Sequence, residues 1–573
     1  MLEFIITIFS YVLEYLPWII YMLCTPRIIH FFQMEGYKTS DYTRWLGRNM
    51  KTAFGPGIKQ LLACGAIGLI SVLINGLVGT KFLLTNVEIQ FLTLVEMLAT
   101  FTVYTVVNFA QIKKDINDRK NAKKKLVYTA RVKRLIAWNF VLFILLYASF
   151  IVPSLYSYDG IIDLALLNVL TYMNTTMTLV YCSVFIALIP FNVLLANYLA
   201  WPTETGINDR FIKQAKRKLK KREYKNLIRI GITGSYGKTS TKFILKTILS
   251  EKYNVLATPE SYNTTMGNVR VIREQLKTEH EVFISEMGAR YRRDIAEICD
   301  FVRPQYSIIT SIGPQHLETF KSIDNIIKTK ADIINTMEPD GVVFLSKDNE
   351  HCKKLYNKEN REKYSYSLKS KDADVYAQNI VLDENGSNFV AITSIGKINC
   401  STKLLGEHNI ENVLGCIAIA VKLGLSVEQI EAGVKKIEPV PHRLQILNNN
   451  NGTIVIDDAF NSNPVGAKMA IDVLGKFKGR KIVITPGMVE LGKEEKNENR
   501  KFGKHMASVV DIAILVGQKR SEPIVEGLRQ GKFNEMNIFV VQDLKAATAK
   551  LAEVSQVGDV ILFENDLPDS YNE

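Results

Sequence analysis

A glycine-rich segment, Gly231-Ile-Thr-Gly-Ser-Tyr-Gly-Lys-Thr-Ser-Thr241, constrains this chain more than any other feature. It follows the apolar run 227–230 and opens the amphipathic stretch 242–249, which predicts a strand, a tight turn and a helix start. Backbone N–H groups of such a turn surround phosphate oxygens, and the positive end of the following helix favours their charge. Lys238 and Thr239 stand where side chains reach the terminal phosphates and Mg²⁺. The segment therefore predicts a nucleoside triphosphate site.

The glycine spacing differs from that of the general phosphate-binding loop, whose first glycine stands five residues before the second. Here Ile232 holds that place, and the glycines are Gly231, Gly234 and Gly237. A chance glycine-rich turn is the alternative, so the assignment depends on the rest of the chain.

Apolar residues are concentrated in the first third of the 573 residues. Nearly uncharged stretches of membrane-spanning length lie at 4–23, 61–78, 87–110, 135–155 and 176–199. Glu14 interrupts the first of them and no basic start precedes it, which disfavours a signal peptide. We therefore expect an α-helical transmembrane domain of about five helices over residues 1–200, with the membrane bilayer as its partner.

The formal net charge of +13 lies mainly beside these stretches. Basic residues crowd 113–134, between the third and fourth segments, and 210–225, within a basic juxtamembrane linker expected at 201–226. The positive-inside rule places these loops in the cytoplasm, so we expect a multi-pass cell-membrane protein with cytoplasmic catalytic domains. Splitting 161–200 into two helices would put the nucleotide site outside, where ATP is absent. Basic residues beside a bilayer bind anionic headgroups, so the charge does not predict nucleic-acid binding.

Short β-branched runs alternate with helical patterns after Asn226, as is typical of parallel α/β sheets. The runs are 282–285, 307–310, 342–345, 454–456, 482–484, 512–516, 538–541 and 560–563. Pro439 to His442 interrupts the alternation. We therefore expect two α/β domains, over 227–440 and 441–573. The seven cysteines are scattered without a C-x-x-C pair, which indicates neither a disulfide framework nor a zinc site.

Gly234-Ser-Tyr-Gly-Lys-Thr-Ser240 resembles the ATP loop of the Mur ligase family, the enzymes that add amino acids to the peptidoglycan precursor. Further segments match family motifs in order: Ser261-Tyr-Asn-Thr264 with Gly267, Glu286-Met-Gly-Ala289, His316-Leu-Glu, Lys330-Ala-Asp-Ile333, Gly406-Glu-His-Asn-Ile-Glu-Asn412, Pro441-His-Arg443 and Asp457-Asp-Ala-Phe-Asn-Ser-Asn-Pro464. Within the family, the segments at 286–289, 330–333 and 457–464, together with Val489-Glu-Leu-Gly492, are most similar to the member that adds D-alanyl-D-alanine to UDP-N-acetylmuramoyl-tripeptide. The resemblance implies a P-loop central domain and a Rossmann-like C-terminal domain, and it stops at Trp201.

The resemblance implies an ATP-dependent ligase that activates a carboxylate as an acyl phosphate, which an amine then attacks. Catalytic positions match Lys238, Glu286, His316 and Lys330, and Mg²⁺ ligands match Thr239, Glu286, His316 and Lys330, the last as a carbamylated lysine. Nucleotide-binding positions match Gly234, Ser235, Gly237, Lys238, Thr239, Ser240, Asn412 on the adenine, Arg443 on a phosphate and Asp458 from the last domain. Asn461 and Asn463 line the amine site or serve turn chemistry.

Two segments depart from the family pattern and bear on the substrates. After Ala289 the chain reads Arg290-Tyr-Arg-Arg-Asp294, without the expected His and Gly, and its C-terminus reads Phe563-Glu-Asn-Asp-Leu-Pro568 in place of a Lys-Gly-Ser-Arg run. The leading hypothesis is a membrane ligase for a cell-wall or other surface-polymer precursor. It joins an amino acid or dipeptide to a carboxylate acceptor that is lipid-linked or handed over at the membrane. The alternatives are an ordinary D-alanyl-D-alanine ligase localised by its helices, a polyglutamate-type synthase, and a transporter or scaffold with an ATPase switch.

Overall fold

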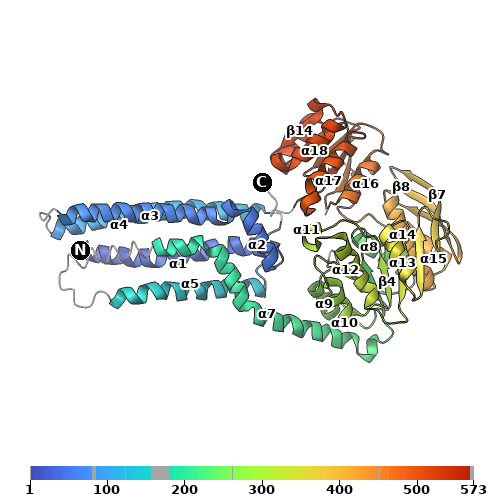
Figure 1. Cartoon of the computed structure of the whole chain (residues 1–573), viewed down its shortest axis with the longest axis horizontal. Coiled ribbons are helices and arrows are strands. Elements are labelled where there is room, and N and C mark those ends of the chain that lie inside the picture. Colours follow the sequence, from blue (N-terminus) through green and yellow to red (C-terminus); the bar gives the residue numbers. More distant parts are fainter. Residues whose placement is uncertain are drawn as a thin grey trace. The chain divides into compact units, whose positions relative to one another are not determined.

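The computed structural model describes residues 2–80, 86–122, 124–156, 180–260, 262–448, 452–460 and 462–567. They form two compact units, a helical one within residues 1–207 and an α/β one within residues 208–567. In Figure 1 the first unit is blue to green and the second is green to red. Ser261, Asn461 and residues 161–179 of the stretch 161–200, which could be split into two helices, lie outside the described residues.

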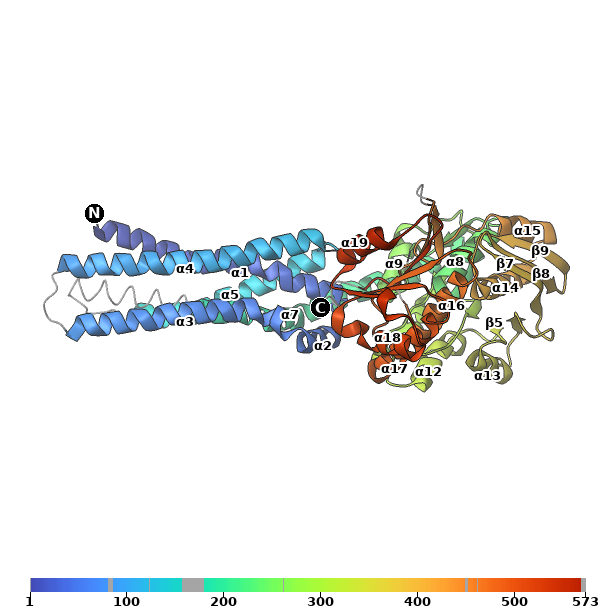
Figure 2. The ribbon, with the colours of Figure 1, turned by 90° about the horizontal axis from the view of Figure 1, so that it is seen from above.

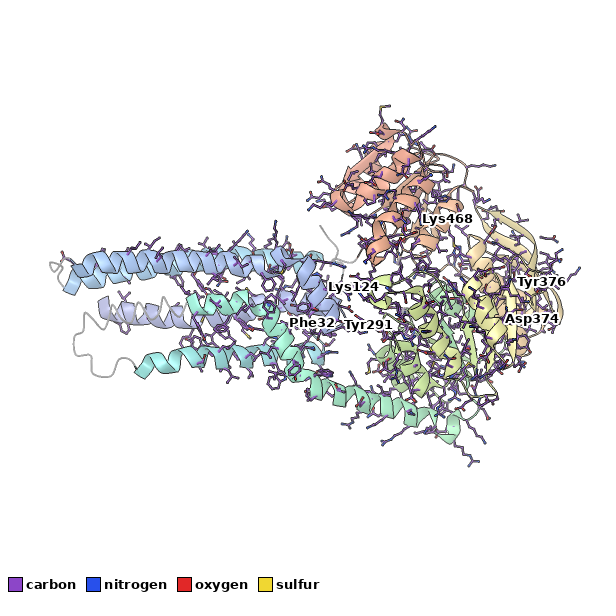
Figure 3. All side chains as sticks on the ribbon, viewed as in Figure 1. Phe32, Lys124, Tyr291, Asp374, Tyr376 and Lys468 are labelled. Carbon is purple, nitrogen blue, oxygen red and sulfur yellow. The ribbon has the colours of Figure 1, made fainter. Side chains whose placement is uncertain are left out.

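The helical unit is built from long helices that pack side by side. They are α1 (Leu2–Met34), α3 (Met50–Thr80), α4 (Asn86–Asn121) and α5 (Ala130–Tyr156), with the short α2 (Thr39–Arg48) between α1 and α3. Helix α1 packs on α4 and α5, and α3 packs on α4, as Figures 1 and 2 show. Aromatic side chains fill the interior: Tyr21 stacks on Phe143 with ring centroids 4.3 Å apart, and Phe32, labelled in Figure 3, is fully buried.

The outer faces of these helices carry large apolar side chains. Leu62 on α3 is 68% exposed and Phe109 on α4 is 67% exposed. Within the described residues, one helical segment, Ala130–Ser149, is long and apolar enough to cross a membrane, or two if a bent pair forms one span. The expectation of about five spanning helices is therefore not confirmed, although most of the described residues up to Ala200 are helical.

The bent pair shows where the last expected span is broken. Residues Val180–Ala187 and helix α7 (Ile189–Leu219) meet at an angle of 66°. Pro190 stands at the break, and proline has no N–H to donate to the preceding turn and clashes with the carbonyl four residues back. Helix α7 continues through much of the expected linker, and its last turns bury Ala215 and Leu219 in the α/β unit.

The first sheet of the α/β unit has nine strands in the order β2-β3-β1-β4-β5-β6-β7-β8-β9. The strands are β1 (Ile228–Thr233), β2 (Val255–Ala257), β3 (Val282–Glu286), β4 (Tyr306–Ile309), β5 (Val342–Ser346), β6 (Lys363–Ser367), β7 (Val375–Asp383), β8 (Gly386–Thr393) and β9 (Gly396–Thr402). Strands β1 to β7 pair in parallel, and β8 and β9 add an antiparallel extension. Because β1 lies between β3 and β4, the carboxyl ends of these three strands meet at one edge.

Helices cover both faces of this sheet, since its strands are apolar on both sides. The face with Ile230, Ile284 and Ile308 packs on α8 (Lys238–Leu249), α14 (Glu407–Lys422) and α15 (Val427–Lys435). The face with Phe283 and Ile309 packs on α9 (Thr265–Glu274), α10 (Asp294–Val302) and α12 (Ile323–Asn335). Two further helices are α11 (Leu317–Phe320) and α13 (Glu350–Lys358).

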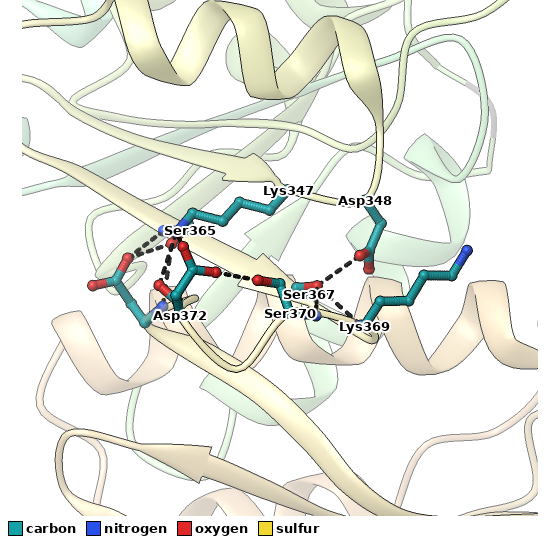
Figure 4. Close-up of polar contacts among 8 residues, drawn as sticks. Lys347, Asp348, Ser365, Ser367, Lys369, Ser370 and Asp372 are labelled. Atoms are coloured by element: carbon teal, nitrogen blue, oxygen red, sulfur yellow. Dashed lines mark hydrogen bonds and ion pairs between the residues drawn. The ribbon is translucent and has the colours of Figure 1, made fainter.

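A polar turn closes the short parallel connection between β6 and β7. Parallel strands usually need a crossover of a dozen residues, but only seven separate Ser367 from Val375. Ser367 Oγ donates to Asp348 Oδ1 at 2.6 Å and accepts from the N–H groups of Lys369 and Ser370, while Lys347 Nζ donates to Asp372 (Figure 4). These contacts satisfy the carboxylates internally, so the cluster serves the fold.

The second sheet has six strands in the order β10-β11-β15-β12-β13-β14. They are β10 (Gln445–Asn448), β11 (Ile454–Asp458), β12 (Lys481–Thr485), β13 (Ile512–Val516), β14 (Ile538–Val541) and β15 (Val560–Glu564), with helices α16 (Pro464–Leu474), α17 (Glu495–Met506), α18 (Gln518–Gln530) and α19 (Leu544–Val554). All pair in parallel except β10. The prediction of two mainly parallel α/β sheets is confirmed, whereas the predicted runs include neither β2, β6 and β7 nor β8, β9 and β10, which pair in antiparallel fashion.

Candidate active site

The glycine-rich loop joins β1 to α8 in a conformation that needs its glycines. Gly237 is the N-cap of α8 with φ of 78°, and a Cβ there would lie 2.7 Å from Asn412 Oδ1. A Cβ on Gly234 would lie 2.0 Å from Thr310 Oγ1. Both contacts are too close for any side chain, so the turn is held tightly between the segment that follows β4 and helix α14.

Lys238 curls back over this loop. Its Nζ donates to the carbonyl oxygens of Gly234 at 2.8 Å and Ser235 at 3.2 Å. Ser235 in turn is anchored by its backbone N–H, 2.7 Å from Ser311 O, and by its hydroxyl, 3.0 Å from Gly313 O. Burial lowers the pKa of Lys238 to about 8. A buried lysine held on the loop, with Ser240 on the first turn of the next helix, suits an anionic ligand.

Glu286 ends β3 beside the loop and is fully buried. Its Oε1 accepts from Thr239 Oγ1 at 3.0 Å and from Asn263 Nδ2 at 3.2 Å. Lys242 Nζ lies 3.0 Å from Oε2 and forms a buried ion pair with it. A carboxylate beside a phosphate loop is the kind of oxygen ligand that Mg²⁺ prefers.

Lys242 and Asn263 were not assigned roles from the sequence. Asn263 lies in a quoted motif. Lys242 carried a readable signal, because it stands four residues after Lys238 on the apolar stripe of α8, where an ordinary surface lysine does not belong. It is fully buried and also donates to Glu260 O.

Lys330 lies in α12 and is buried next to the loop. Burial lowers the pKa of its amine well below the ordinary value, and the positive charge of Lys238 adds to this shift. Glu286 opposes it. The buried amine therefore lies in the electrostatic field of Lys238 and Glu286, so the structure brings these three predicted residues together.

His316 is the N-cap of α11 and has φ of 51°. Its Nδ1 lies 2.5 Å from Glu490 Oε2. Burial lowers the pKa of His316, although the Glu490 carboxylate acts in the opposite direction, and Lys238 also lowers it. Glu490 lies in the Val489-Glu-Leu-Gly492 motif, but no pattern in the sequence pairs it with His316.

The remaining nucleotide-binding candidates lie around the same loop. Asn412 Oδ1 accepts from Thr241 Oγ1 at 3.2 Å. Burial lowers the pKa of Arg443, while the carboxylates of Asp458 and Glu286 raise it. Burial also raises the pKa of Asp458 to about 6. The guanidinium of Arg443 thus feels charges of both sheet domains, Asp458 in the last domain and Glu286 in the central one.

Asn463 serves the turn chemistry that was the alternative to a role in the amine site. Its Oδ1 accepts from Gly466 N at 2.8 Å and caps α16. A second buried carboxylate lies in the C-terminal segment that differs from the family pattern. Glu564, at the end of β15, accepts from Thr485 Oγ1 at 2.5 Å and from Ser462 Oγ, and burial raises its pKa to about 7.

The donor set fits magnesium, which the family resemblance implies. Across the described ranges, no group of three His, Cys, Asp or Glu side chains could hold a metal by itself. Mg²⁺ is commonly held by one or two carboxylates together with substrate phosphates and water. Thr239 and Glu286, directly bonded beside the phosphate loop, match that pattern.

Comparisons with known proteins agree with this geometry. The family model of the Mur ligase middle domain matches residues 232–420, and that of the Mur ligase glutamate ligase domain matches residues 442–564. The UDP-N-acetylmuramoyl-tripeptide--D-alanyl-D-alanine ligase of Buchnera aphidicola subsp. Baizongia pistaciae is 31% identical over 275 residues, 48% of this chain and 59% of its own length. The ligase of the same name from Escherichia coli K12 is 28% identical, over 51% of this chain and 64% of its own length.

Solved structures show the same fold. MurF from Acinetobacter baumannii superposes with a TM-score of 0.57 and 25% identity, covering 64% of this chain and 78% of that protein. MurF from Thermotoga maritima, in complex with ADP, gives 0.56 and 24% identity, covering 63% and 80%. The chain spans about three fifths of the length of the curated relatives named above. Two adjacent family domains with the phosphate loop between β1 and α8 lead to one conclusion: the chain belongs to the Mur ligase family.

Proposed function

We propose that this chain is an ATP-dependent ligase that joins a carboxylate to an amine through an acyl phosphate. The observation that carries the proposal is the grouping of Lys238, Thr239 and Glu286 at the carboxyl ends of β1 and β3. Phosphoryl transfer is catalysed mainly by positioning and by charge placed where the transition state develops it. A lysine on a phosphate loop beside a buried carboxylate provides those elements.

In the proposed reaction an oxygen of the acceptor carboxylate attacks the γ-phosphorus of ATP, ADP leaves, and a mixed anhydride forms. The amine then attacks the acyl carbon, inorganic phosphate leaves, and the amine loses a proton. Lys238 neutralises charge on the transferred phosphoryl group. Thr239 and Glu286 would hold Mg²⁺, which supplies further neutralisation of the phosphates when bound.

Lys330 and His316 complete the proposed cation site. Burial favours the neutral amine of Lys330, and the neutral amine is the form that adds carbon dioxide, losing a proton to give a carbamate anion. We expect Lys330→Ala to be nearly inactive and Lys330→Glu to retain more turnover, because glutamate restores an anion. A mass spectrum showing the bare amine in the active protein would exclude the carbamate.

Nucleotide binding is proposed to span the two sheet domains. Gly234, Ser235, Gly237 and Ser240 cradle the phosphates with Lys238 and Thr239, Asn412 faces the adenine, and Arg443 and Asp458 contribute from the junction and the last domain. The electrostatic link of Arg443 to both Asp458 and Glu286 supports this arrangement.

The helical unit is proposed to be a multi-pass membrane domain of about five helices, with the catalytic domains in the cytoplasm. Exposed apolar side chains such as Leu62 and Phe109 support this proposal, because an apolar outer surface is stable against lipid and not against water. The basic residues of 113–134 and 210–225 would lie at the cytoplasmic headgroups.

The acceptor is proposed to be a cell-wall or other surface-polymer precursor that is lipid-linked or handed over at the membrane. The relatives are named as UDP-N-acetylmuramoyl-tripeptide--D-alanyl-D-alanine ligases. Attachment to a membrane raises the effective concentration of a membrane-bound acceptor far more than that of a soluble one. The segments 290–294 and 563–567 differ from the family pattern, which supports substrates other than those of the relatives.

The experiment is phosphate release and product mass with the full-length protein in detergent. One arm offers lipid-linked precursors with a panel of amino acids and dipeptides, and the other offers UDP-N-acetylmuramoyl-tripeptide with D-alanyl-D-alanine. Amine-dependent turnover in the first arm supports the proposal. Efficient turnover in the second would refute the lipid-linked acceptor, a ladder of product lengths would indicate a polyglutamate-type synthase, and amine-independent phosphate release would indicate an ATPase switch.

A further inference from the structure

A carboxylate of the six-stranded domain reaches a candidate cation ligand of the nine-stranded domain. Glu490 lies between β12 and the 3₁₀ turn Gly492–Glu494, and its Oε2 is 2.5 Å from His316 Nδ1. Its Oε1 accepts a hydrogen bond from the guanidinium of Arg290, on the loop after β3. The contact therefore joins two domains at the edge of the site.

The loop that carries Glu490 is fixed on its own domain. Asn499, almost fully buried, accepts from Met488 N at 2.9 Å and donates to Met488 O at 2.9 Å. Asn565 Nδ2 donates to Gly487 O at 2.6 Å. Glu490 itself has φ of 65°, a conformation that non-glycine residues rarely adopt and that persists where surrounding structure enforces it. The carboxylate thus has a defined place relative to the C-terminal sheet.

The hydrogen bond to Glu490 decides which nitrogen of His316 is available. A carboxylate beside Nδ1 holds the proton there and fixes the ring, which leaves the lone pair on Nε2 for a ligand. His316 also has positive φ, at the start of a helix of only four residues. The hydrogen bond that orients the ring comes from the other domain.

Arg290 forms a second interaction with Glu490, an ion pair. It stands in the segment Arg290-Tyr-Arg-Arg-Asp294, which departs from the family pattern. Its guanidinium attracts the carboxylate independently of the histidine, so the Arg290–Glu490 ion pair favours docking of the two domains, while the Glu490–His316 hydrogen bond orients the imidazole. Variants that remove one contact and keep the other can therefore distinguish domain docking from orientation of the imidazole.

We propose that Glu490 is a positioning residue that couples the docking of the C-terminal domain to the orientation of His316. Docking brings the carboxylate to Arg290 and His316 together, so the imidazole is set for the nucleotide-bound cation only when the domains meet. The inference rests on the proposed function, in which His316 helps to hold that cation, and it adds the residue that links the site to domain closure.

The test uses the full-length protein with ADP and Mn²⁺ as a spectroscopic probe. Pulsed EPR detects imidazole nitrogen coordinated to Mn²⁺, and spin labels at the exposed positions Lys358 and Met536 report the distance between domains. We expect Glu490→Gln to lose the nitrogen coupling and to weaken Mn²⁺ binding about 10-fold. Glu494→Gln, an exposed neighbour in the 3₁₀ turn, serves as the matched control and should behave as the unchanged protein.

A charge exchange separates the two contacts. Each single variant, Arg290→Glu or Glu490→Arg, should lengthen the interdomain distance. The double variant should restore that distance but not the nitrogen coupling, because arginine cannot accept a hydrogen bond from Nδ1. Thermal unfolding and metal-free ADP binding check that each variant is folded. Retention of the coupling and of Mn²⁺ affinity in Glu490→Gln, or retention of the coupling in His316→Ala, would overturn the proposal. If the unchanged protein shows the nitrogen coupling to Mn²⁺ but forms no amide product, the proposed ligase activity is refuted and the positioning role of Glu490 is not.

Discussion

The two units place their apolar side chains in opposite ways. In the α/β unit both faces of the nine-stranded sheet are covered by helices, and exposed apolar residues are scattered, such as Val557 and Met536 in turns and Val381 on β7. In the helical unit the interior is aromatic, yet the outer faces of α3 and α4 still expose Leu62 and Phe109. The first arrangement is typical of a protein surrounded by water, and the second suits a surrounding of lipid. The proposed chemistry and the proposed membrane anchoring are thereby assigned to different parts of the chain.

The largest expected effect tests whether the chemistry belongs to the α/β unit alone. Lys238→Ala should lower the rate of ADP formation about 10³-fold, because the ammonium stabilises charge that develops in phosphoryl transfer. Lys246→Ala, at an exposed position on the same helix α8, is the control and should leave the rate within a factor of two or so. Near-normal turnover of Lys238→Ala would show that the site is elsewhere.

The next prediction compares the two surfaces directly. Leu62→Lys places a charge on the outer face of α3, which should cost about 3 kcal/mol if that face meets lipid. Val557→Lys, at an 83% exposed position of the α/β unit, should change the free energy of unfolding by less than about 0.5 kcal/mol. Membrane insertion and unfolding in bicelles measure both. Equal, small effects would break the contrast between the units.

A third prediction concerns the pH dependence of the α/β unit. Burial raises the pKa of Glu564 to about 7 in the folded state, above its unfolded value of about 4.3. The folded state therefore binds more protons between these values, and stability falls as pH rises from about 4.5 through about 7. Glu564→Gln should remove up to about 3 kcal/mol of this fall, measured by chemical denaturation at pH 5 and pH 8. An unchanged pH profile would show that other groups cause it.

The smallest expected effect concerns the N-terminal cap of a helix in the α/β unit. Ser426 forms a capping box at the start of α15, with its hydroxyl accepting from Gln429 N and the Gln429 side chain accepting from Ser426 N. Ser426→Ala should cost about 1 kcal/mol of unfolding free energy. Ser401→Ala, on the exposed face of β9, should cost much less. Equal losses in the two variants would contradict the capping assignment.

Much of the α/β unit was predictable, because its signals are local. The apolar run before Gly231 and the amphipathic stretch after Lys238 predict β1 and α8, and both are confirmed. The eight β-branched runs likewise correspond to strands. Strands β8 and β9 were missed, since a half-exposed antiparallel extension has mixed composition and gains its stability from partners far along the chain. The bend between Val180–Ala187 and α7 was not predicted, although Pro190 indicates a helix break at that point.

Motif order in the sequence by itself determined the family, the phosphate loop and the residues that belong to it. Pairing between distant residues was decided only by the tertiary structure. Lys242 reads as a helix lysine until β3 places Glu286 3.0 Å away, and Glu490 reads as a loop acid until the domains meet at His316. The physical reason is that hydrogen bonds and ion pairs act over a few ångströms in space, whereas a sequence orders residues along the chain and leaves their approach to the packing of the sheets.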